Sequence, residues 1–292
     1  MKVATIIPSS GRPVELGRWV EHMARQTVRP ITAVFAVASQ ADLPETDLNV
    51  ARITPVICKR TGSCHQRNVG LSAVLGSADV ITFFDDDYVP SSRCLEGIRN
   101  LFDAHPDVVA ANGTLLADGI NSPGISYNEA LAAIEAHDRA PPSPPRILGD
   151  LSGLYGCNMA FRATAIGDER FDERLPLYAW QEDIDFAARV GKRGRIVKTN
   201  AFHGVHQGVK RARASGMRFG YSQIANPLYL ISKGTMGTRE AIPLMIKNII
   251  KNHSRALFPE PWIDRRGRCV GNWRALFDVL RRRDDPRNIL RM

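Results

Sequence analysis

The sequence predicts an α/β fold with a mostly parallel central sheet flanked by helices, continued by a helical and basic C-terminal extension. Over the first two thirds of the 292 residues, short apolar runs alternate with segments of helical periodicity. The runs are hydrophobic at nearly every position, which is typical of strands buried on both faces of a parallel sheet. From about residue 200 onward the pattern becomes mainly helical.

The strands are predicted from apolar runs that end at turn or polar residues. The run at residues 3–8 ends in Pro-Ser-Ser-Gly, and the run at residues 79–84 ends in three aspartates. Because turn residues interrupt regular structure, these endings set the strand limits. The predicted strands are residues 3–8, 31–38, 50–57, 79–84, 108–112, 157–161 and 194–199.

The helices are predicted from apolar residues that recur every three or four positions. In the first of them, Val14, Trp19, Val20 and Met23 have helical spacing. Residues 139–146 contain four prolines and are predicted to form a loop. The predicted helices are residues 13–26, 65–75, 91–104, 217–233, 239–257 and 272–283.

Composition excludes several classes of protein. Hydrophobic residues make up 44 % and charged residues 24 % of the chain, which excludes disorder, collagen and coiled coil. No run approaches the roughly 18 apolar residues of a membrane span, and the N-terminal run is too short for a signal peptide. The five cysteines are scattered without a CxxC pair, so we expect reduced thiols in a cytoplasmic protein, without disulfides or a zinc site.

Charge is distributed unevenly along the chain. Up to Phe186 there are 16 Lys and Arg against 24 Asp and Glu, whereas from Ala187 there are 23 against 6. Such a basic part is expected to meet the anionic inner face of a membrane or a phosphorylated substrate; the alternative is a solvated face without a partner. Nucleic acid is disfavoured because no binding motif accompanies the charge.

The C-terminal extension is both basic and amphipathic. An apolar side beside its lysines and arginines is typical of peripheral attachment to an anionic membrane. The alternative is an ordinary helix packed on the catalytic domain. The apolar residues are Ile242, Leu244, Met245, Ile246, Ile249 and Ile250.

Three consecutive aspartates, Asp85, Asp86 and Asp87, directly follow the apolar run at residues 79–84. Crowded carboxylates repel one another unless a cation is present. Ligands of open α/β sheets bind at the carboxyl ends of the strands, where these side chains are expected. Hard oxygen donors suit Mn²⁺ or Mg²⁺, so we predict a site for one of these ions.

Two further segments carry candidate chemistry. Glu182 and Asp183 are predicted near the start of a helix, where the alternative role is simply a favourable first-turn charge. His203 and His206 follow the predicted strand at residues 194–199, and one of them is expected to add an imidazole to the metal site.

A basic, glycine-containing loop precedes the predicted helix at residues 65–75. Free backbone N–H groups at a helix start can bind an anion such as a phosphate. Gly62 lies in this loop, and Arg67 lies one or two turns into the helix, where its guanidinium is expected to reach the same phosphate.

The order of these motifs resembles that of family 2 glycosyltransferases with the GT-A fold. The resemblance covers about residues 2–232 and implies a catalytic domain over 1–232, with a nucleotide-sugar half at about 1–115 and an acceptor half at about 116–232. Residues 233–292 then form the extension. The segments that carry the resemblance are residues 6–13, 62–70, 85–87, 156–162, 171–173 with 182–183, and 218–226.

The resemblance implies a role for each candidate residue. Asp183 would be the general base and Glu182 would orient it or the acceptor. The metal ligands would be Asp85 and Asp87 with His206 or His203. Residues that bind the nucleotide or its diphosphate would be Pro8, Ser10, Arg12, Ser39, Gly62, Arg67, Asp85, Asp86, Lys210 and Arg211.

The implied function is inverting, metal-dependent transfer of a sugar from a nucleoside-diphosphate sugar to an acceptor hydroxyl, carbohydrate or lipid-linked. Family members commonly carry an acidic residue that reads the base; here only Ser39 or Asp42 is available, which leaves the nucleotide open. The resemblance favours UDP, with GDP and dTDP as alternatives. The alternatives are a sugar-nucleotide nucleotidyltransferase, a hydrolase with metal-activated water, and a non-catalytic carbohydrate- or membrane-binding protein.

Overall fold

The computed structural model describes residues 1–141, 143–210 and 215–292. The chain divides into two units. We call Met1–Thr61, His65–Arg170 and Val190–Ala212 the N-terminal unit. The remaining Gly62–Cys64, Phe171–Arg189 and Arg213–Met292 form the C-terminal unit.

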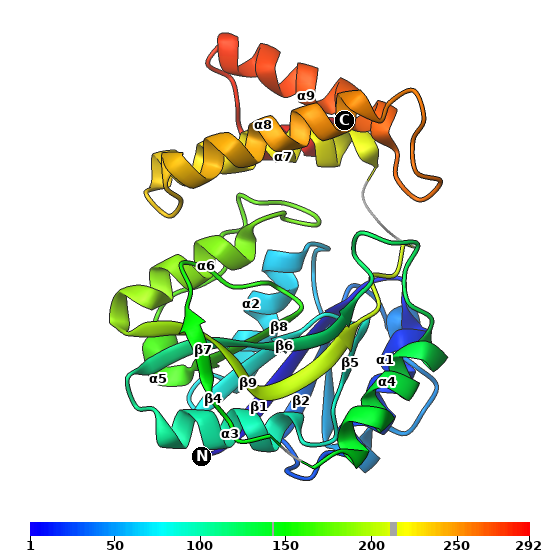
Figure 1. The fold of residues 1–292 in the computed structure, drawn as a ribbon, viewed down its shortest axis with the longest axis vertical. Helices are drawn as coiled ribbons and strands as arrows, with labels where there is room; N and C mark the ends of the chain where they lie inside the picture. Colours follow the sequence, from blue (N-terminus) through cyan, green and yellow to red (C-terminus); the bar gives the residue numbers. More distant parts are fainter. Residues whose placement is uncertain (142, 211–214) are drawn as a thin grey trace. The chain divides into compact units, whose positions relative to one another are not determined.

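In the described ranges, nine strands form one sheet, all of it in the N-terminal unit (Figure 1). Its order is β3-β2-β1-β4-β8-β6-β9-β5, and β7 pairs with β9. The strands are β1 (Val3–Ser9), β2 (Thr32–Val37), β3 (Ile53–Ile57), β4 (Val80–Phe84), β5 (Tyr88–Pro90), β6 (Val108–Asp118), β7 (Ile147–Asp150), β8 (Asn158–Arg162) and β9 (Arg195–His206).

The sheet is parallel where the sequence alternates most regularly and mixed beyond that point. Strand β1 pairs in parallel with β2 and β4, and β2 pairs in parallel with β3. Strand β8 then enters antiparallel between β4 and β6, whereas β9 runs parallel to β6. The carboxyl ends of β1, β2 and β4 therefore meet at one edge of the sheet, which is where α/β proteins bind ligands.

The helices of the N-terminal unit cover this sheet with apolar side chains. Trp19 of the first helix is buried and stacks on Phe84 at the end of β4, with ring centroids 5.4 Å apart. This packing holds the strand end that precedes the three aspartates. The helices are α1 (Pro13–Ala24), α2 (Ser63–Val74), α3 (Cys94–Ala104), α4 (Tyr127–Arg139) and α5 (Ala163–Ile166); 3₁₀ turns lie at Gln40–Asp42, Leu48–Ala51 and Gly191–Arg193.

The C-terminal unit is helical. Helix α7 packs against both α8 and α9, and glycines allow the close approach: a Cβ added at Gly220 or Gly271 would collide with the backbone of the facing helix. The hydrophobic core of the C-terminal unit includes Tyr221, Ile224 and Met245. The elements are α6 (Glu182–Val190), α7 (Gly216–Lys233), α8 (Thr238–Ser254), α9 (Arg265–Leu280) and a 3₁₀ turn at Pro286–Arg291. None of the helices in the described ranges has both the length and the apolar character that a membrane span requires.

Most predicted elements match, and three differences have physical causes. The strand predicted at residues 194–199 continues to His206, because β9 pairs along β6 and then with β5. Helix α4 was not predicted from its weak apolar pattern, although Ser126 caps it. Helix α7, which was predicted within the first domain, packs with α8 and α9 in the C-terminal unit. All five cysteines are free thiols.

Candidate active site

The three aspartates lie in a turn at the carboxyl end of β4. All five residues of β4 are buried, so the strand ends where the first charged side chain begins. The backbone N–H of Asp85 donates to Cys157 O of the neighbouring chain segment at 3.2 Å, and Tyr88 N–H donates to Asp85 O at 3.1 Å. The turn is thereby fixed on both sides, and the side chains point in different directions.

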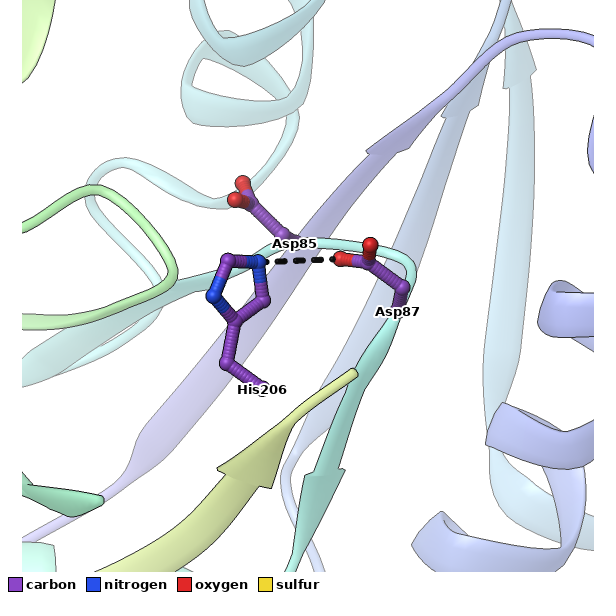
Figure 2. A group of neighbouring side chains, drawn as sticks. All are labelled: Asp85, Asp87 and His206. Carbon is purple, nitrogen blue, oxygen red and sulfur yellow. Dashed lines mark ion pairs between the residues drawn. The ribbon is translucent and has the colours of Figure 1, made fainter. Parts of the chain in front are cut away.

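Asp85, Asp87 and His206 form a cluster. One potential ligand atom from each lies within 4.8 Å of the others. Figure 2 shows the two carboxylates arriving from the turn after β4 and the imidazole from the end of β9, with Nε2 of His206 3.4 Å from Oδ1 of Asp87. The cause is register: β5 and β9 pair antiparallel with Tyr88 opposite His206, which brings the histidine beside Asp87.

This donor set fits a divalent cation. Two carboxylate oxygens and one imidazole nitrogen suit Mn²⁺ or Mg²⁺. With bonds of about 2.1 Å, ligands of such an ion lie roughly 3 to 4.2 Å apart, so three ligand atoms within 4.8 Å of one another need only a small closure. Asp87 and His206 are buried and Asp85 is half-buried, which leaves one side of the cluster open to a ligand.

Asp118 and Tyr155 orient the histidine. Nδ1 of His206 lies 2.8 Å from Oδ1 of Asp118, whose Oδ2 accepts from the Tyr155 hydroxyl at 3.2 Å. A carboxylate on one imidazole nitrogen turns the other toward a metal. Burial by itself would lower the pKa of His206, but hydrogen bonds to Asp118 and Asp87 raise it to about 10. A cation that binds Nε2 must therefore displace a proton.

Asp118 and Tyr155 are not among the site residues predicted from the sequence. Asp118 is the last residue of β6, opposite His206 in the parallel β6–β9 register. Only the continuation of β6 and β9 past their predicted ends at residues 112 and 199 brings the two together. An acidic residue ending an apolar run was the available signal, as it was for Asp85.

Asp86 points to a different set of partners. Its carboxylate accepts from the Ser9 hydroxyl and from Nη1 of Arg12, both at 2.6 Å. Nη1 of Arg12 also lies 3.6 Å from Oδ2 of Asp87, so this guanidinium links the two carboxylates. Of the predicted residues at the end of β1, Arg12 thus joins the aspartates, whereas Pro8 is half-buried and Ser10 is exposed.

The loops after β1 and β2 are tied together by Asp42. Its carboxylate accepts from Gly11 N–H at 2.7 Å and from Ser39 N–H at 2.9 Å. The sequence left Ser39 and Asp42 as alternatives for reading the nucleotide base. The structure puts them side by side, with Asp42 engaged in holding both loops.

Arg67 of α2 reaches the aspartates. Nη2 of Arg67 donates to Oδ1 of Asp85 at 3.0 Å. Gln66 fixes the helix start, since its amide donates to the carbonyl oxygens of Ser9 and Ala36. Gly62 belongs to the C-terminal unit and adopts a φ of 137°, which favours glycine.

The segment after β9 folds back over Asp87. Val209 N–H donates to Oδ2 of Asp87 at 2.8 Å. The ammonium of Lys210 donates to the carbonyl oxygens of Gly119 and Ile120, each at 2.9 Å. Lys210 therefore lies beside the end of β6, near Asp118, while the predicted Arg211 lies outside the described residues.

The structure does not bring His203 to the cluster. Residues three apart on a strand point to opposite faces of the sheet, so only one of the two histidines can face Asp87. The His203 ring instead lies against His137 of α4, with ring centroids 4.3 Å apart. Burial lowers the pKa of His203 to about 4. Of the two predicted histidines, the structure therefore brings His206 to the two aspartates.

Glu182 and Asp183 begin helix α6 in the C-terminal unit, as the sequence predicted. The preceding segment is strained: Leu177, Ala179 and Gln181 have φ values of 58°, 52° and 76°, which are uncommon for residues other than glycine. Such strain gathers at functional sites. The hydroxyl of Ser63 donates to Oε1 of Glu182 at 3.4 Å.

Helix α6 is anchored through Asp185, one turn beyond its first residue. The buried carboxylate accepts from Lys233 at 2.9 Å and from the Thr235 hydroxyl at 2.8 Å, and it also pairs with Arg189. Asp172 accepts from the same Lys233 at 2.6 Å. These bonds fix the start of α6 within the C-terminal unit, and with it the orientation of the two acidic residues.

One curated relative shares sequence with the chain. Glucosyl-dolichyl phosphate glucuronosyltransferase of Haloferax volcanii is 26 % identical over 172 residues, covering 56 % of this chain and 53 % of the relative. The chain thus spans about half the length of that protein. No family model matches the chain.

Solved structures share the fold. The S. aureus TarS 1–349 complex with UDP-GlcNAc superposes with a TM-score of 0.53 at 13 % identity, covering 89 % of this chain and 74 % of that one. GalNAc-T7 with UDP, GalNAc and Mn²⁺ has a TM-score of 0.53 at 12 % identity, covering 78 % and 50 %. These likenesses confirm the predicted GT-A fold.

Proposed function

We propose that the protein is an inverting, metal-dependent glycosyltransferase that moves a sugar from a nucleoside-diphosphate sugar, with UDP favoured, to an acceptor hydroxyl. The observation that carries the proposal is the Asp85, Asp87 and His206 cluster at the carboxyl end of β4. The UDP complexes of the solved neighbours support a uridine nucleotide donor.

In this proposal Asp87 and His206 hold the cation, and Asp85 completes the set on the open side. A bound Mn²⁺ or Mg²⁺ supplies positive charge that stabilises the diphosphate leaving group. The guanidinium of Arg67, which donates to Asp85, supplies a charge-assisted hydrogen bond. When a metal ion binds the Asp85 carboxylate, this guanidinium would donate to a phosphate oxygen instead.

The nucleoside is proposed to lie along the end of β1. Pro8 and Ser10 border it, and Arg12 with Asp86 faces its ribose, while Ser39 lies in the loop after β2 that would meet the base. The diphosphate side would be bordered by Lys210. The support is the grouping of Arg12 and Asp86 next to the metal cluster.

Asp183 is proposed as the general base and Glu182 as the residue that orients it or the acceptor. In a single displacement the acceptor oxygen attacks the anomeric carbon from the face opposite the leaving diphosphate, which inverts the stereochemistry. A base is needed because an alcohol is a poor nucleophile at neutral pH. The strained segment before α6 and the fixed position of that helix support a functional role for its start.

We infer that the acceptor is a carbohydrate or a lipid-linked molecule in polysaccharide or glycoconjugate synthesis. The curated relative is named for a dolichyl phosphate substrate, which favours the lipid-linked class. We place the reaction on the cytoplasmic side of a membrane, in line with the free thiols of the chain.

Calorimetric titration tests the donor site. UDP, GDP and dTDP are titrated into the protein with and without Mn²⁺, and into Asp87→Ala. One nucleotide should bind tightly, only with Mn²⁺ and only when Asp87 is present. Exposed Asp107, which pairs with Arg195, supplies the matched control Asp107→Ala. Absence of nucleotide binding under every metal condition would refute the donor site.

Transfer assays test the base once the donor is known. Asp183→Asn should lower the transfer rate by about 10²–10⁴-fold while leaving nucleotide binding unchanged. Unchanged transfer in this variant would remove Asp183 from the mechanism without affecting the donor site.

A further inference from the structure

Helix α8 exposes a row of isoleucines. Its buried side, with Ala241, Met245 and Asn252, packs inside the C-terminal unit. On the other side Ile242, Ile246 and Ile250 are 46 %, 50 % and 61 % exposed. Residues four apart lie one above another on a helix, so these side chains form one continuous apolar row.

Helix α9 exposes a second apolar row that includes aromatic side chains. Val270, Trp273, Phe277 and Leu280 follow one another at intervals of three or four residues and are 50–84 % exposed. The opposite side of the helix buries Gly271, Asn272 and Ala275. The exposed positions are therefore a consistent face of α9 and not the frayed end of a helix.

The two rows meet at a contact between the helices. The ring of His253, on α8, lies edge-on to the indole of Trp273, with centroids 5.8 Å apart. We call the joined surface the α8–α9 face; it consists of Ile242, Ile246, Ile250, Val270, Trp273, Phe277 and Leu280. Contiguous exposed apolar surface of this kind marks a binding site rather than ordinary surface.

Basic residues surround the α8–α9 face. Residues 238–283 contain 11 Lys and Arg against 4 Asp and Glu. Two of those acids serve the fold, since Glu260 pairs with Arg255 and Arg265, and Asp264 caps α9. The exposed cations at the rim of the face include Arg239, Lys247, Arg266, Arg274 and Arg281, the last of which lies over the Phe277 ring.

We propose that the α8–α9 face binds the surface of an anionic lipid bilayer. Aliphatic and aromatic side chains of an interfacial helix enter the boundary between headgroups and acyl chains, while Lys and Arg contact anionic headgroups. A second copy of the chain is a poorer occupant, because two faces rimmed by the same positive charge would repel each other. The inference stands on this face alone and does not require the transfer reaction.

Vesicle sedimentation with the full-length protein tests the proposal. The protein is mixed with vesicles of phosphatidylcholine alone or of phosphatidylcholine with phosphatidylglycerol. It should sediment with the anionic vesicles, at least about tenfold more weakly with the neutral ones, and less as salt is raised. A wild-type protein that stays in solution with anionic vesicles would overturn the proposal.

Variants at exposed positions locate the surface. Ile246→Asn with Phe277→Asn should weaken vesicle binding at least about tenfold, because two apolar side chains no longer leave water. The matched control, Val50→Asn with Leu148→Asn, removes two apolar side chains of the N-terminal unit that are each 55 % exposed and should bind as wild type. Equal binding by both double variants would contradict the assigned face.

A charge pair and two further measurements complete the test. Lys247→Glu with Arg274→Glu should weaken binding to anionic vesicles only, unlike the exposed control Lys192→Glu.

Sedimentation velocity without lipid should show no mass change in Ile246→Asn with Phe277→Asn; a dimer that this variant dissociates would assign the face to a second copy instead. Mn²⁺-dependent UDP titration of the same variants separates membrane binding from donor binding, because each can fail alone.

Discussion

Two clusters of carboxylates, one in each unit, are neutralised in different ways. In the C-terminal unit the ammonium of Lys233 lies 2.6 Å from Asp172 and 2.9 Å from Asp185, so a tethered cation sits between them. In the N-terminal unit Asp85 and Asp87 instead converge with the His206 imidazole, and Arg67 and Arg12 approach from the sides.

We interpret the difference as one between a structural cluster and the proposed metal site. A lysine attached to α7 cannot leave, so the pair it makes with Asp185 fixes α6 permanently. Asp85, Asp87 and His206 bring their ligand atoms within 4.8 Å of one another, while Arg67 and Arg12 pair with the carboxylates from the sides. The proposed role of this cluster is to take up a free ion together with the diphosphate that the ion binds. Buried carboxylates alone therefore do not identify a site; the identity of the cation that faces them does.

The largest expected effect is at the cluster of the N-terminal unit. Asp87→Asn keeps the shape of the side chain but removes its charge, so Mn²⁺-dependent UDP binding and transfer should fall about 10³-fold. Calorimetry and transfer assays measure this, with Asp107→Asn as the exposed control. A loss of only a few fold would mean that both clusters are structural.

The tethered cation should matter for stability and not for metal binding. Lys233→Met removes the ammonium shared by Asp172 and Asp185 and leaves buried Asp185 with Arg189, which should cost about 2 kcal/mol of unfolding free energy. Denaturant unfolding measures this cost; exposed Lys247→Met should stay within about 0.5 kcal/mol. If Lys233→Met unfolds like wild type, the ammonium does not hold α6.

Asp118 should affect the metal affinity of the cluster through its contact with His206. Asp118→Asn keeps a polar group beside Nδ1 of His206 but removes the carboxylate, so Mn²⁺ affinity should fall about 10–100-fold. Mn²⁺ titration measures this fall, and UDP binding at saturating Mn²⁺ should recover. Asp150→Asn, at an exposed carboxylate that pairs with Arg195, provides the control. Equal Mn²⁺ affinity in both variants would exclude an orienting role for Asp118.

The smallest effect concerns acid stability of the C-terminal unit. Burial by itself would raise the pKa of Asp172, but hydrogen bonds from Lys233 and Tyr229 lower it below its usual value of 3.8. A carboxyl group whose pKa is lower in the folded state stabilises the fold above the unfolded pKa, and this stabilisation is lost as pH falls. Melting temperatures of Asp172→Asn should therefore fall less steeply than those of wild type below about pH 5. Parallel pH profiles would contradict the assignment.

Much of the fold could be predicted because the strands and helices follow from the local pattern of apolar and polar residues. The apolar runs predicted β1, β2 and β4, and the three aspartates predicted that the proposed metal site lies at the carboxyl end of β4. The limits of the site could not be predicted in the same way. Strand β9 has a weaker pattern after residue 199, so its pairing with β5 and β6, and hence the choice of His206 over His203, depends on neighbours far away in sequence.

The sequence by itself determined the α/β architecture, the acidic strand end and the basic C-terminal part, because periodicity and residue type express these features locally. Only the tertiary structure decided that Asp118 orients His206, that Lys233 neutralises Asp172 and Asp185, and that α8 turns Ile242, Ile246 and Ile250 outward. Each of these depends on strand register or helix packing between residues distant in sequence. An amphipathic pattern shows that a helix has an apolar side, but packing decides which apolar residues are left for a partner.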